Sequence, residues 1–433
     1  MKKVFCLTLA AAMFASAATA GAANRKELKE NLESHVAVHG FIRNYFAFDT
    51  RESVAGTGDL FYWVPKDENI VDDVDFNAQP QFRFLALTSR LWVDVNGYQI
   101  ENTKIGARVE ADFYAGLTGV TGTAQFRLRQ AYVTLGWEQE NANETLKIGQ
   151  AWHPMAADMP DVFSLNTGAP FGPFSRTPVA QLDANFGSNF GLTAAAIWQQ
   201  QYPSTGPDGS SANYIKYSCV PEMYLGLNVT VGPFLARAGV DVLSIKPRNK
   251  GVNAELKSVK VKDRITTVSP FIYAQVKTKI GKVPFTAKAK TIVAQDGSHL
   301  SLNGGYGVSS ISTDGSYGYT PTRNSSTWVS LAFGSKFQGV LFGGYVKNFG
   351  TKDELMSIDG LYFSKNSFKN MNQMWRVTPT FMYNLGKFTL GLEYEITSIQ
   401  YGKWDENFKH GLATKDLHWV TNNRLQAMVK FTF

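Results

Sequence analysis

The chain has 433 residues and a formal net charge of +7, with 13% aromatic and only 18% charged residues. This length suits two or three soluble domains or one large barrel, and so low a charged fraction is unusual for a soluble surface. The mean hydropathy of −0.18 is too polar for a bundle of membrane helices. Together these values are typical of an all-β protein with one lipid-facing band and one wet face.

The first residues carry the pattern of a secretory signal peptide. Lys2 and Lys3 precede an apolar stretch over 4–17, and small residues at 18–20 form a cleavage site. We therefore exclude residues 1–20 from the fold. The rest of the sequence holds no apolar stretch long enough for a transmembrane helix, so none is expected.

A short charged segment at 21–34 follows, which we expect to lie in the periplasm as a short helix or a linker. Cys6 belongs to the signal peptide, so Cys219 has no partner for an intramolecular disulfide. An exported basic protein rarely meets nucleic acid. Its positive charge therefore points to anionic solutes or lipids, and no nucleic-acid partner is expected.

Runs of about 10–15 residues that alternate between polar and apolar positions recur along the remaining chain. Each run is typical of a strand with one apolar face. Sixteen such runs lie near 36–49, 82–96, 99–114, 125–138, 144–152, 178–186, 190–201, 213–231, 234–245, 264–280, 283–296, 326–338, 340–349, 373–385, 387–401 and 420–433.

The connections between these runs fall into two classes that alternate. Seven are tight and rich in Gly and Asn, as hairpin turns require; they lie at 96–98, 138–143, 187–189, 231–233, 280–282, 337–339 and 385–387. Eight are longer and lie near 50–81, 115–124, 153–177, 202–212, 246–263, 297–325, 350–372 and 402–419. A soluble sandwich has no reason to segregate its loops in this way.

These features predict a transmembrane antiparallel up-and-down β-barrel of about sixteen strands over 35–433, with short periplasmic turns and long outer loops. In hydrocarbon every backbone donor and acceptor must be paired, so the sheet keeps no free edge. The last run, which ends at Phe433, should therefore pair with the first and close the wall. We also expect the outer-membrane assembly machinery to recognise this terminal strand. A barrel of sixteen strands is wide enough to leave an aqueous channel.

Assigning the polar face of each run to the interior predicts a channel with more cations than anions. Such a lining raises the local concentration of anions, although these charges could instead merely solvate the wall. The predicted pore-lining, anion-selecting residues are Arg43, Arg90, Arg108, Arg127, Arg129, Arg176, Lys277, Lys288, Lys290 and Arg376.

The third long connection, at 153–177, is too apolar for an exposed tip, and we expect it to fold inward and constrict the pore. Its predicted constriction residues are Asp158, Asp161, Phe163, Phe171 and Phe174. The two acids, together with Arg176, would then lie opposite the arginines of the early strands. The alternative is an outer loop packed on its neighbours. The glycine-rich stretch at 304–310 is expected to be a mobile outer tip.

Three motifs resemble the DcaP-like and phosphate-selective porin families: "LTSRLWVDV" at 87–95, "FRLRQAYVTL" at 126–135 and "IGQAW" at 148–152. The resemblance implies that the arginines of the first two motifs, Arg90, Arg127 and Arg129, line the channel. It is clearest over 36–190. Gln130 stands where the family leads us to expect His, and the segment after the signal is shorter than the coiled coil of some members.

The same families are trimeric, so the resemblance implies a homotrimer. One local feature agrees with an interface: Gln130, Tyr132 and Thr134 share a face with Leu128, which leaves the run at 125–138 without a clean apolar side. A face buried between subunits need not be compatible with lipid.

Enzyme functions find little support. The six histidines are scattered without the spacing of a metal site, and no GxSxG motif occurs; no catalytic residue, metal or cofactor is expected. The sequence therefore predicts a porin in the outer membrane of a Gram-negative bacterium. It would admit small hydrophilic, preferentially anionic solutes and contact outer-membrane lipid and lipopolysaccharide. The alternative function is a receptor or adhesin that acts through its long loops.

Overall fold

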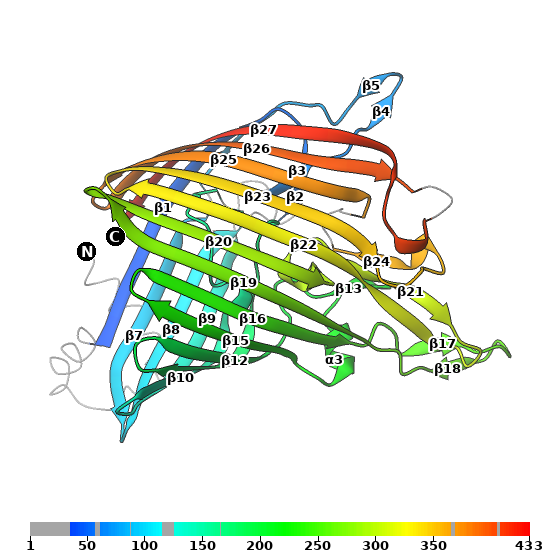
Figure 1. Ribbon diagram of the computed structural model, residues 1–433, viewed down its shortest axis with the longest axis horizontal. Helices are drawn as coiled ribbons and strands as arrows, with labels where there is room; N and C mark the ends of the chain where they lie inside the picture. Colours follow the sequence, from blue (N-terminus) through cyan, green and yellow to red (C-terminus); the bar gives the residue numbers. More distant parts are fainter. Residues whose placement is uncertain are drawn as a thin grey trace.

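The computed structural model describes residues 35–56, 61–86, 88–114, 125–164, 166–364, 369–404 and 408–433. The predicted signal peptide and the segment at 21–34 lie outside the described residues, as does the long connection at 115–124. The main sheet is a closed antiparallel barrel of sixteen strands (Figure 1). In the described part of the chain, no helix is long and apolar enough to cross a bilayer.

Each predicted run contributes one strand to the wall, and each strand pairs with the next along the chain. The second run is interrupted, and its two pieces both pair with the first strand. The wall consists of β1 (Val36–Asp49), β6 with β7 (Gln81–Leu85 and Arg90–Ile100), β8 (Thr103–Tyr114), β9 (Gln125–Glu138), β10 (Ala142–Trp152), β11 (Arg176–Phe186), β12 (Phe190–Ile197), β15 (Glu222–Val231), β16 (Phe234–Ile245), β19 (Ile265–Ile280), β20 (Val283–Gln295), β22 (Tyr317–Gly334), β23 (Phe337–Thr351), β25 (Met371–Leu385), β26 (Phe388–Lys403) and β27 (Lys415–Thr432).

The two ends of the chain close the barrel. Strand β27 pairs antiparallel with β1, from Phe41 opposite Thr432 to Asp49 opposite Arg424. The last residue continues this seam, because the backbone of Phe433 exchanges two hydrogen bonds with Gly40, of 2.9 and 3.2 Å. A Cβ atom at Gly40 would lie 2.6 Å from the Phe433 ring, so only glycine fits beside it. The predicted closure of the first strand by the last is confirmed.

Two of the predicted turns are displaced. The segment at 96–98 is not a turn: β7 continues to Ile100, and Gly97 lies at a register shift within the strand, with a φ of +84°. The chain reverses after it, at Glu101, which has a φ of +50°. The turn predicted at 337–339 lies earlier, because β22 ends at Gly334. In both cases a residue with positive φ, rather than the Gly-containing triplet predicted from the sequence, marks the corner.

Apart from the one at 115–124, which lies outside the described residues, the long connections lie at one end of the barrel and the short turns at the other (Figure 1). The long connections carry small elements of their own: β2 (Ser53–Gly56), β3 (Phe61–Pro65), β4 (Ile70–Val71), β5 (Val74–Asp75), η3 (Pro154–Ala156), β13 (Thr205–Gly206), β14 (Gly209–Ser210), α3 (Asn213–Ser218), β17 (Lys250–Val252), β18 (Ser258–Lys260), η4 (Gly297–Leu300), β21 (Gly305–Ile311), η5 (Ile358–Gly360), β24 (Leu361–Phe363) and η6 (Phe408–His410).

The structure settles the start of the run at 213–231, which the sequence left unclear: its first residues form helix α3, and its strand begins only at Glu222. One prediction for these connections is wrong. Residues 304–310 are not a mobile tip, because most of them form β21, which pairs with both β22 and β24. Tyr306 and Val308 are buried there, since the inner side of the loop packs against the barrel mouth. Cys219, which follows α3, is a free and exposed cysteine.

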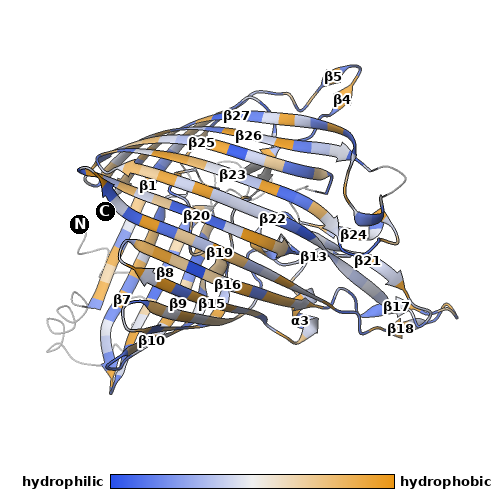
Figure 2. Ribbon diagram, viewed as in Figure 1, coloured by the Kyte–Doolittle hydropathy of each residue, from blue (hydrophilic) through white to orange (hydrophobic). Residues whose placement is uncertain are grey.

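The wall strands alternate apolar and polar residues along their length (Figure 2). In β26, Leu390 and Leu392 are 40% and 51% exposed on the outside, whereas Glu393 and Glu395 are 0% and 3% exposed on the inside. An outward apolar face and an inward charged face are the arrangement that lipid outside and water inside require.

Strand β9 contains a β-bulge at Arg129. Opposite it, Glu110 pairs with Gln130 and the next residue, Ala111, pairs with Leu128, so Arg129 is an extra residue. Leu128 faces outward and is 50% exposed, whereas Gln130 faces inward and is 6% exposed. The prediction that both share one face is wrong, because the bulge reverses the alternation. A subunit contact is therefore not needed to explain this strand.

Candidate functional site

Five arginines gather on the inner face of the early strands, around two carboxylates. Arg127 makes two hydrogen bonds to Asp112, of 2.9 and 3.0 Å. Arg129 bridges both acids, at 2.6 Å from Glu110 and 2.7 Å from Asp112. Arg127 and Arg129 face inward because they lie two residues apart in the strand. The bulge adds Gln130 to the same face, where it donates to Glu110 over 3.1 Å. We call Arg43, Arg90, Arg127, Arg129 and Arg176 the arginine wall.

The arginine wall carries more positive charge than its acids neutralise. Arg90 lies 3.5 Å from Glu110. Among the described residues, Arg43 and Arg176 have no carboxylate within ion-pair distance. Arg43 instead lies 4.9 Å above the rings of Phe41 and Tyr45 and donates a hydrogen bond to Thr88. Five guanidinium groups against two carboxylates leave an excess of three positive charges.

Part of the excess positive charge of the arginine wall is exposed to water. The side chains of Arg90 and Arg127 are 21% and 22% exposed, whereas that of Arg129 is 5% exposed. The Nε atoms of Arg43 and Arg90 and the Nη1 atom of Arg176 are buried and have no hydrogen-bond partner among the described residues. Guanidinium groups bind anionic oxygens strongly. Those that a passing anion can reach are the partly exposed ones of Arg90 and Arg127.

Two other predicted pore-lining cations lie apart from the arginine wall. Arg108 forms a two-pronged pair with Asp94, at 2.6 and 2.9 Å, which leaves this position neutral. Lys277 is exposed toward the turn end of β19. Neither adds an unpaired charge to the cluster.

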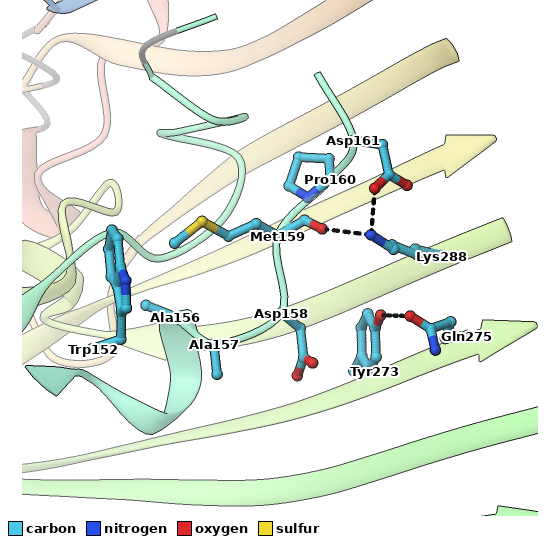
Figure 3. Close-up of a pocket in the computed structure, with 10 residues that line it drawn as sticks. All are labelled: Trp152, Ala156, Ala157, Asp158, Met159, Pro160, Asp161, Tyr273, Gln275 and Lys288. Atoms are coloured by element: carbon cyan, nitrogen blue, oxygen red, sulfur yellow. Dashed lines mark hydrogen bonds and ion pairs between the residues drawn. The ribbon is translucent and has the colours of Figure 1, made fainter. Parts of the chain in front are cut away.

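The connection between β10 and β11, residues 153–175, which we call loop 3, contacts the inner face of the opposite strands. Asp158 lies 2.6 Å from Arg237 of β16. Asp161 lies 2.6 Å from Lys288 of β20 (Figure 3). Both acids approach cations of β16 and β20 rather than the early arginines themselves, so they do not neutralise the arginine wall.

Further along loop 3, its backbone is held by the last strands of the barrel and by β1. The amide of Phe163 donates to Glu393 over 3.1 Å, and its carbonyl accepts from the Tyr45 hydroxyl over 3.1 Å. The carbonyl of Ala169 accepts from Arg376 over 2.9 Å. Loop 3 is thus tied to both sides of the interior.

Two cations that were predicted to line the pore hold loop 3 instead. Lys290 and Arg376 are each 1% exposed. Lys290 donates to the carbonyl of Met155, and Arg376 donates to that of Ala169. The prediction that these two side chains face the aqueous interior is wrong, because loop 3 covers them and uses their charges. Lys288 was also predicted to line the pore, and its side chain remains partly exposed, at 15%.

The aromatic residues of loop 3 form a core inside the barrel. Phe171 and Phe174 are buried, with Trp328 and Phe342 from the wall and Leu300 from the connection at 296–316, which we call loop 6. Phe171 and Phe342 meet edge to face, with ring centroids 6.2 Å apart. Such packing gives loop 3 a fixed position.

Beside loop 3 lies a cavity of about 380 Å³ that opens toward β19 and β20. Trp152 and Met159 line one side of it, and Tyr273, Gln275 and Lys288 line the other (Figure 3). The Tyr273 hydroxyl donates to Gln275 over 3.1 Å. The lining of the cavity is mostly polar, which does not suit an apolar ligand.

Ion pairs hold the described part of loop 1 (residues 50–80), and one of them joins Arg51 to Asp75. Arg51 lies 2.6 Å from Asp75 and also donates to the carbonyl groups of Lys66 and Asp67. Burial acts to raise the pKa of Asp75. Hydrogen bonds from the backbone of Asn69 and from Arg51 outweigh it and lower the pKa below its ordinary value.

The fold has clear relatives among solved structures, although no family model and no curated protein sequence matches the chain. The outer membrane channel DcaP of Acinetobacter baumannii superposes with a TM-score of 0.60 at 17% identity, over 92% of this chain and 97% of that one. An anion-selective porin from Comamonas acidovorans gives 0.51 at 10% identity, over 92% and 99%. OprB of Pseudomonas putida gives 0.50 at 9% identity, over 95% and 97%. The fold is that of an outer-membrane porin.

Several residues of this porin fold that hold the site were not predicted. Tyr45, Glu393 and Ser326 each bind the backbone of loop 3, and Ser326 does so through the carbonyl of Phe171 over 2.7 Å. The alternation of the sequence shows that these residues face inward. It does not show that they bind loop 3, because a side chain that binds a distant loop leaves no local pattern.

Proposed function

We propose that this protein is an outer-membrane porin that passes small hydrophilic solutes by diffusion and prefers anions. The observation that carries the preference is the arginine wall, with its excess of three positive charges and the partly exposed side chains of Arg90 and Arg127. A charged lining in a low-dielectric passage concentrates ions of the opposite sign. The porin fold supports a channel rather than an enzyme.

In this proposal loop 3 narrows the passage and directs it along the arginine wall. Support comes from its anchors on β16, β20 and β25 and from the aromatic core beneath it. Because Asp158 and Asp161 are paired with cations of the far side, the constriction has no free acid opposite the arginines. That arrangement favours anions over cations at the narrowest point.

The direct test is reconstitution of the purified protein in planar bilayers across a potassium chloride gradient. We expect open channels whose reversal potential has the sign of chloride selectivity. A cation-selective reversal potential would contradict the role of the arginine wall, and the absence of conductance would contradict the channel itself.

We further propose that the mature chain starts after residue 20, assembles as a homotrimer, and sits in the outer membrane in contact with lipopolysaccharide. The resemblance of the motifs at 87–95 and 126–135 supports the trimer. The outward apolar faces support the membrane location. Mass measurement of the native protein in mild detergent tests the trimer and the start of the mature chain, since it reports the number of subunits and where the chain begins.

A further inference from the structure

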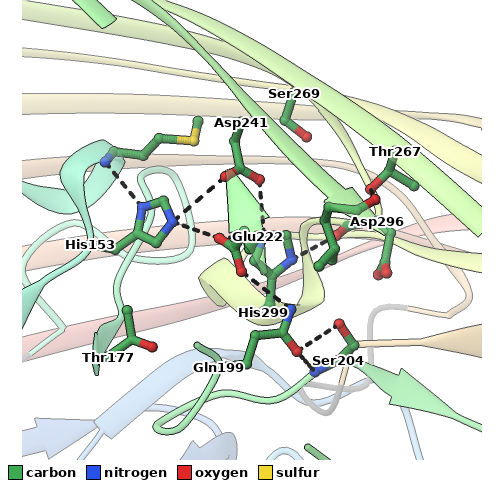
Figure 4. A network of polar contacts seen from close by, with 12 residues as sticks. His153, Thr177, Gln199, Ser204, Glu222, Asp241, Thr267, Ser269, Asp296 and His299 are labelled. Atoms are coloured by element: carbon green, nitrogen blue, oxygen red, sulfur yellow. Dashed lines mark hydrogen bonds and ion pairs between the residues drawn. The ribbon is translucent and has the colours of Figure 1, made fainter. Parts of the chain in front are cut away.

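Four buried titratable side chains meet where loop 3 leaves the wall and loop 6 turns inward (Figure 4). They are His153 of loop 3, Glu222 at the start of β15, Asp241 of β16 and His299 of η4 in loop 6. Each is 1% or 2% exposed. The sequence showed only scattered histidines, and the fold brings two of them against two acids. This cluster lies apart from the arginine wall.

One of the two carboxylates, Asp241, is not fully satisfied by the protein groups around it. Glu222 and Asp241 approach the same two imidazole rings, and the Oδ1 atom of Asp241 has no hydrogen-bond partner among the described residues. A buried carboxylate needs a compensating charge or a full set of donors. Two of them side by side, with an orphan oxygen turned into the cluster, indicate that a cation belongs there.

The backbone fixes which nitrogen of each ring faces the acids. A backbone carbonyl can only accept, so His299 donates through Nδ1 to the carbonyl of Asp296, over 3.1 Å. Its Nε2 is then turned to the acids and is free to act as a ligand. A carbonyl behind the ring is the usual support of a metal-binding histidine.

His153 has the opposite arrangement. The amide of Met155 can only donate, and it lies 3.1 Å from Nδ1 of His153. The proton of the neutral ring is therefore on Nε2, which donates to Glu222 over 2.6 Å. His153 thus orients Glu222 rather than binding a metal, and Gln199 donates to the second oxygen of Glu222 over 3.4 Å.

We propose that Glu222, Asp241 and His299 bind one divalent transition-metal ion of the zinc type. The Nε2 atom of His299 lies 3.4 Å from Glu222 and 3.2 Å from Asp241. These distances match the ~3.3 Å separation of ligands held ~2.0 Å from a tetrahedral zinc ion. Two carboxylates also neutralise a divalent charge, and the imidazole favours zinc over calcium or magnesium.

The ion would fasten loop 6 to the wall beneath loop 3. His299 comes from loop 6, whereas both acids come from adjacent strands. Loop 3 contributes His153, and the Phe174 amide of loop 3 also bonds to the Leu300 carbonyl of loop 6 over 2.9 Å. The site would therefore join the two inward loops to the wall.

The test is zinc binding by the full-length protein in detergent, after chelator treatment and dialysis. We expect isothermal titration calorimetry and elemental analysis to give one zinc per chain. Asp241→Asn and His299→Gln should each weaken binding at least tenfold. The double variant Asp67→Asn/His418→Gln is the matched control, because it removes the exposed His–Asp contact of 2.7 Å elsewhere in the protein. It should leave binding unchanged.

Cobalt provides a readout that does not depend on the variants folding. Wild-type protein loaded with cobalt should show the strong visible absorption of a four-coordinate site with nitrogen and oxygen ligands. Failure of the wild type to bind zinc in a one-to-one ratio would overturn the proposal, as would a cobalt spectrum like that of the aqueous ion. Equal binding by Asp241→Asn and His299→Gln would overturn it too. In those cases a protonated His299 alone compensates the two acids.

Discussion

Neutralising Arg43 and Arg90 should sharply reduce the anion preference of the channel. These two are the right members of the arginine wall to change. Arg43 has no carboxylate partner among the described residues, and Glu110 keeps Arg129 at 2.6 Å when Arg90 is removed. Replacing Arg127 or Arg129 would instead leave Asp112 short of a partner and confuse the result. The double variant Arg43→Gln/Arg90→Gln removes two of the three excess charges.

The size of the effect follows from Coulomb's law. An anion ~7 Å from one guanidinium gains about 0.6 kcal/mol in water, and about half of that after screening at 0.1 M salt. A cation loses the same amount, so each charge contributes about 0.6 kcal/mol to the difference between the two ions. Two charges then contribute about 1.2 kcal/mol, which is roughly an eightfold fall in the anion-to-cation permeability ratio.

The assay is the reversal potential of single channels in a tenfold potassium chloride gradient. The control is Lys250→Gln/Lys260→Gln, which removes two charges from paired exposed positions of β17 and β18 in an outer loop. We expect the control to keep the selectivity of the wild type. A double arginine variant that is as anion-selective as the control would refute the reasoning. Repetition in 1 M salt should shrink the difference, because screening is then nearly complete.

Three further outcomes follow from the structure. Lys288→Met removes the ion pair to Asp161, so loop 3 should loosen. The single-channel conductance should then rise and become noisier. An unchanged conductance trace would argue against a constriction. Gly149→Ala places a Cβ 2.3 Å from a backbone oxygen at a φ of +132° and should cost about 2 kcal/mol of stability, whereas Gly343→Ala, with no atom within 4 Å, should cost little. The comparison is the urea midpoint in lipid vesicles, and equal midpoints would contradict it. The folded pKa of Asp75 lies below its unfolded value, so its stabilisation of loop 1 is present above the unfolded pKa and is lost as the pH falls through the folded one. Hydrogen exchange of loop 1 should therefore rise in acid, after correction for intrinsic rates, and a pH-independent exchange would rule this out.

The barrel was predictable because its constraints are local and repeated. A strand with lipid on one side and water on the other must alternate, and this period recurs along the wall from Val36–Asp49 to Lys415–Thr432, with an interruption at the bulge of β9. Closure was predictable as well, because hydrocarbon forbids a free edge. The positions of the corners were less so, since the turn after β7 depends on Glu101 rather than on the nearby glycine.

The interior was predictable only in part. The alternation of inward and outward positions along each strand placed Arg43, Arg90 and Arg127 inside. This rule fails at a bulge, and the extra residue Arg129 reversed the alternation in the later half of β9. The alternation also does not reveal whether an inward cation contacts water or a loop. Lys290 faces inward but donates to the backbone of loop 3.

The sequence alone thus determined a sixteen-stranded wall, its two faces and its cationic lining, because each depends on the spacing of neighbours along the chain. The tertiary structure decided which charges remain unpaired. Asp158 and Asp161 reach Arg237 and Lys288 on strands distant in the sequence, and His299 meets Glu222 only through the fold of loop 6. Pairing depends on distances across the interior, and those distances are set only when the barrel closes and its loops pack inside it.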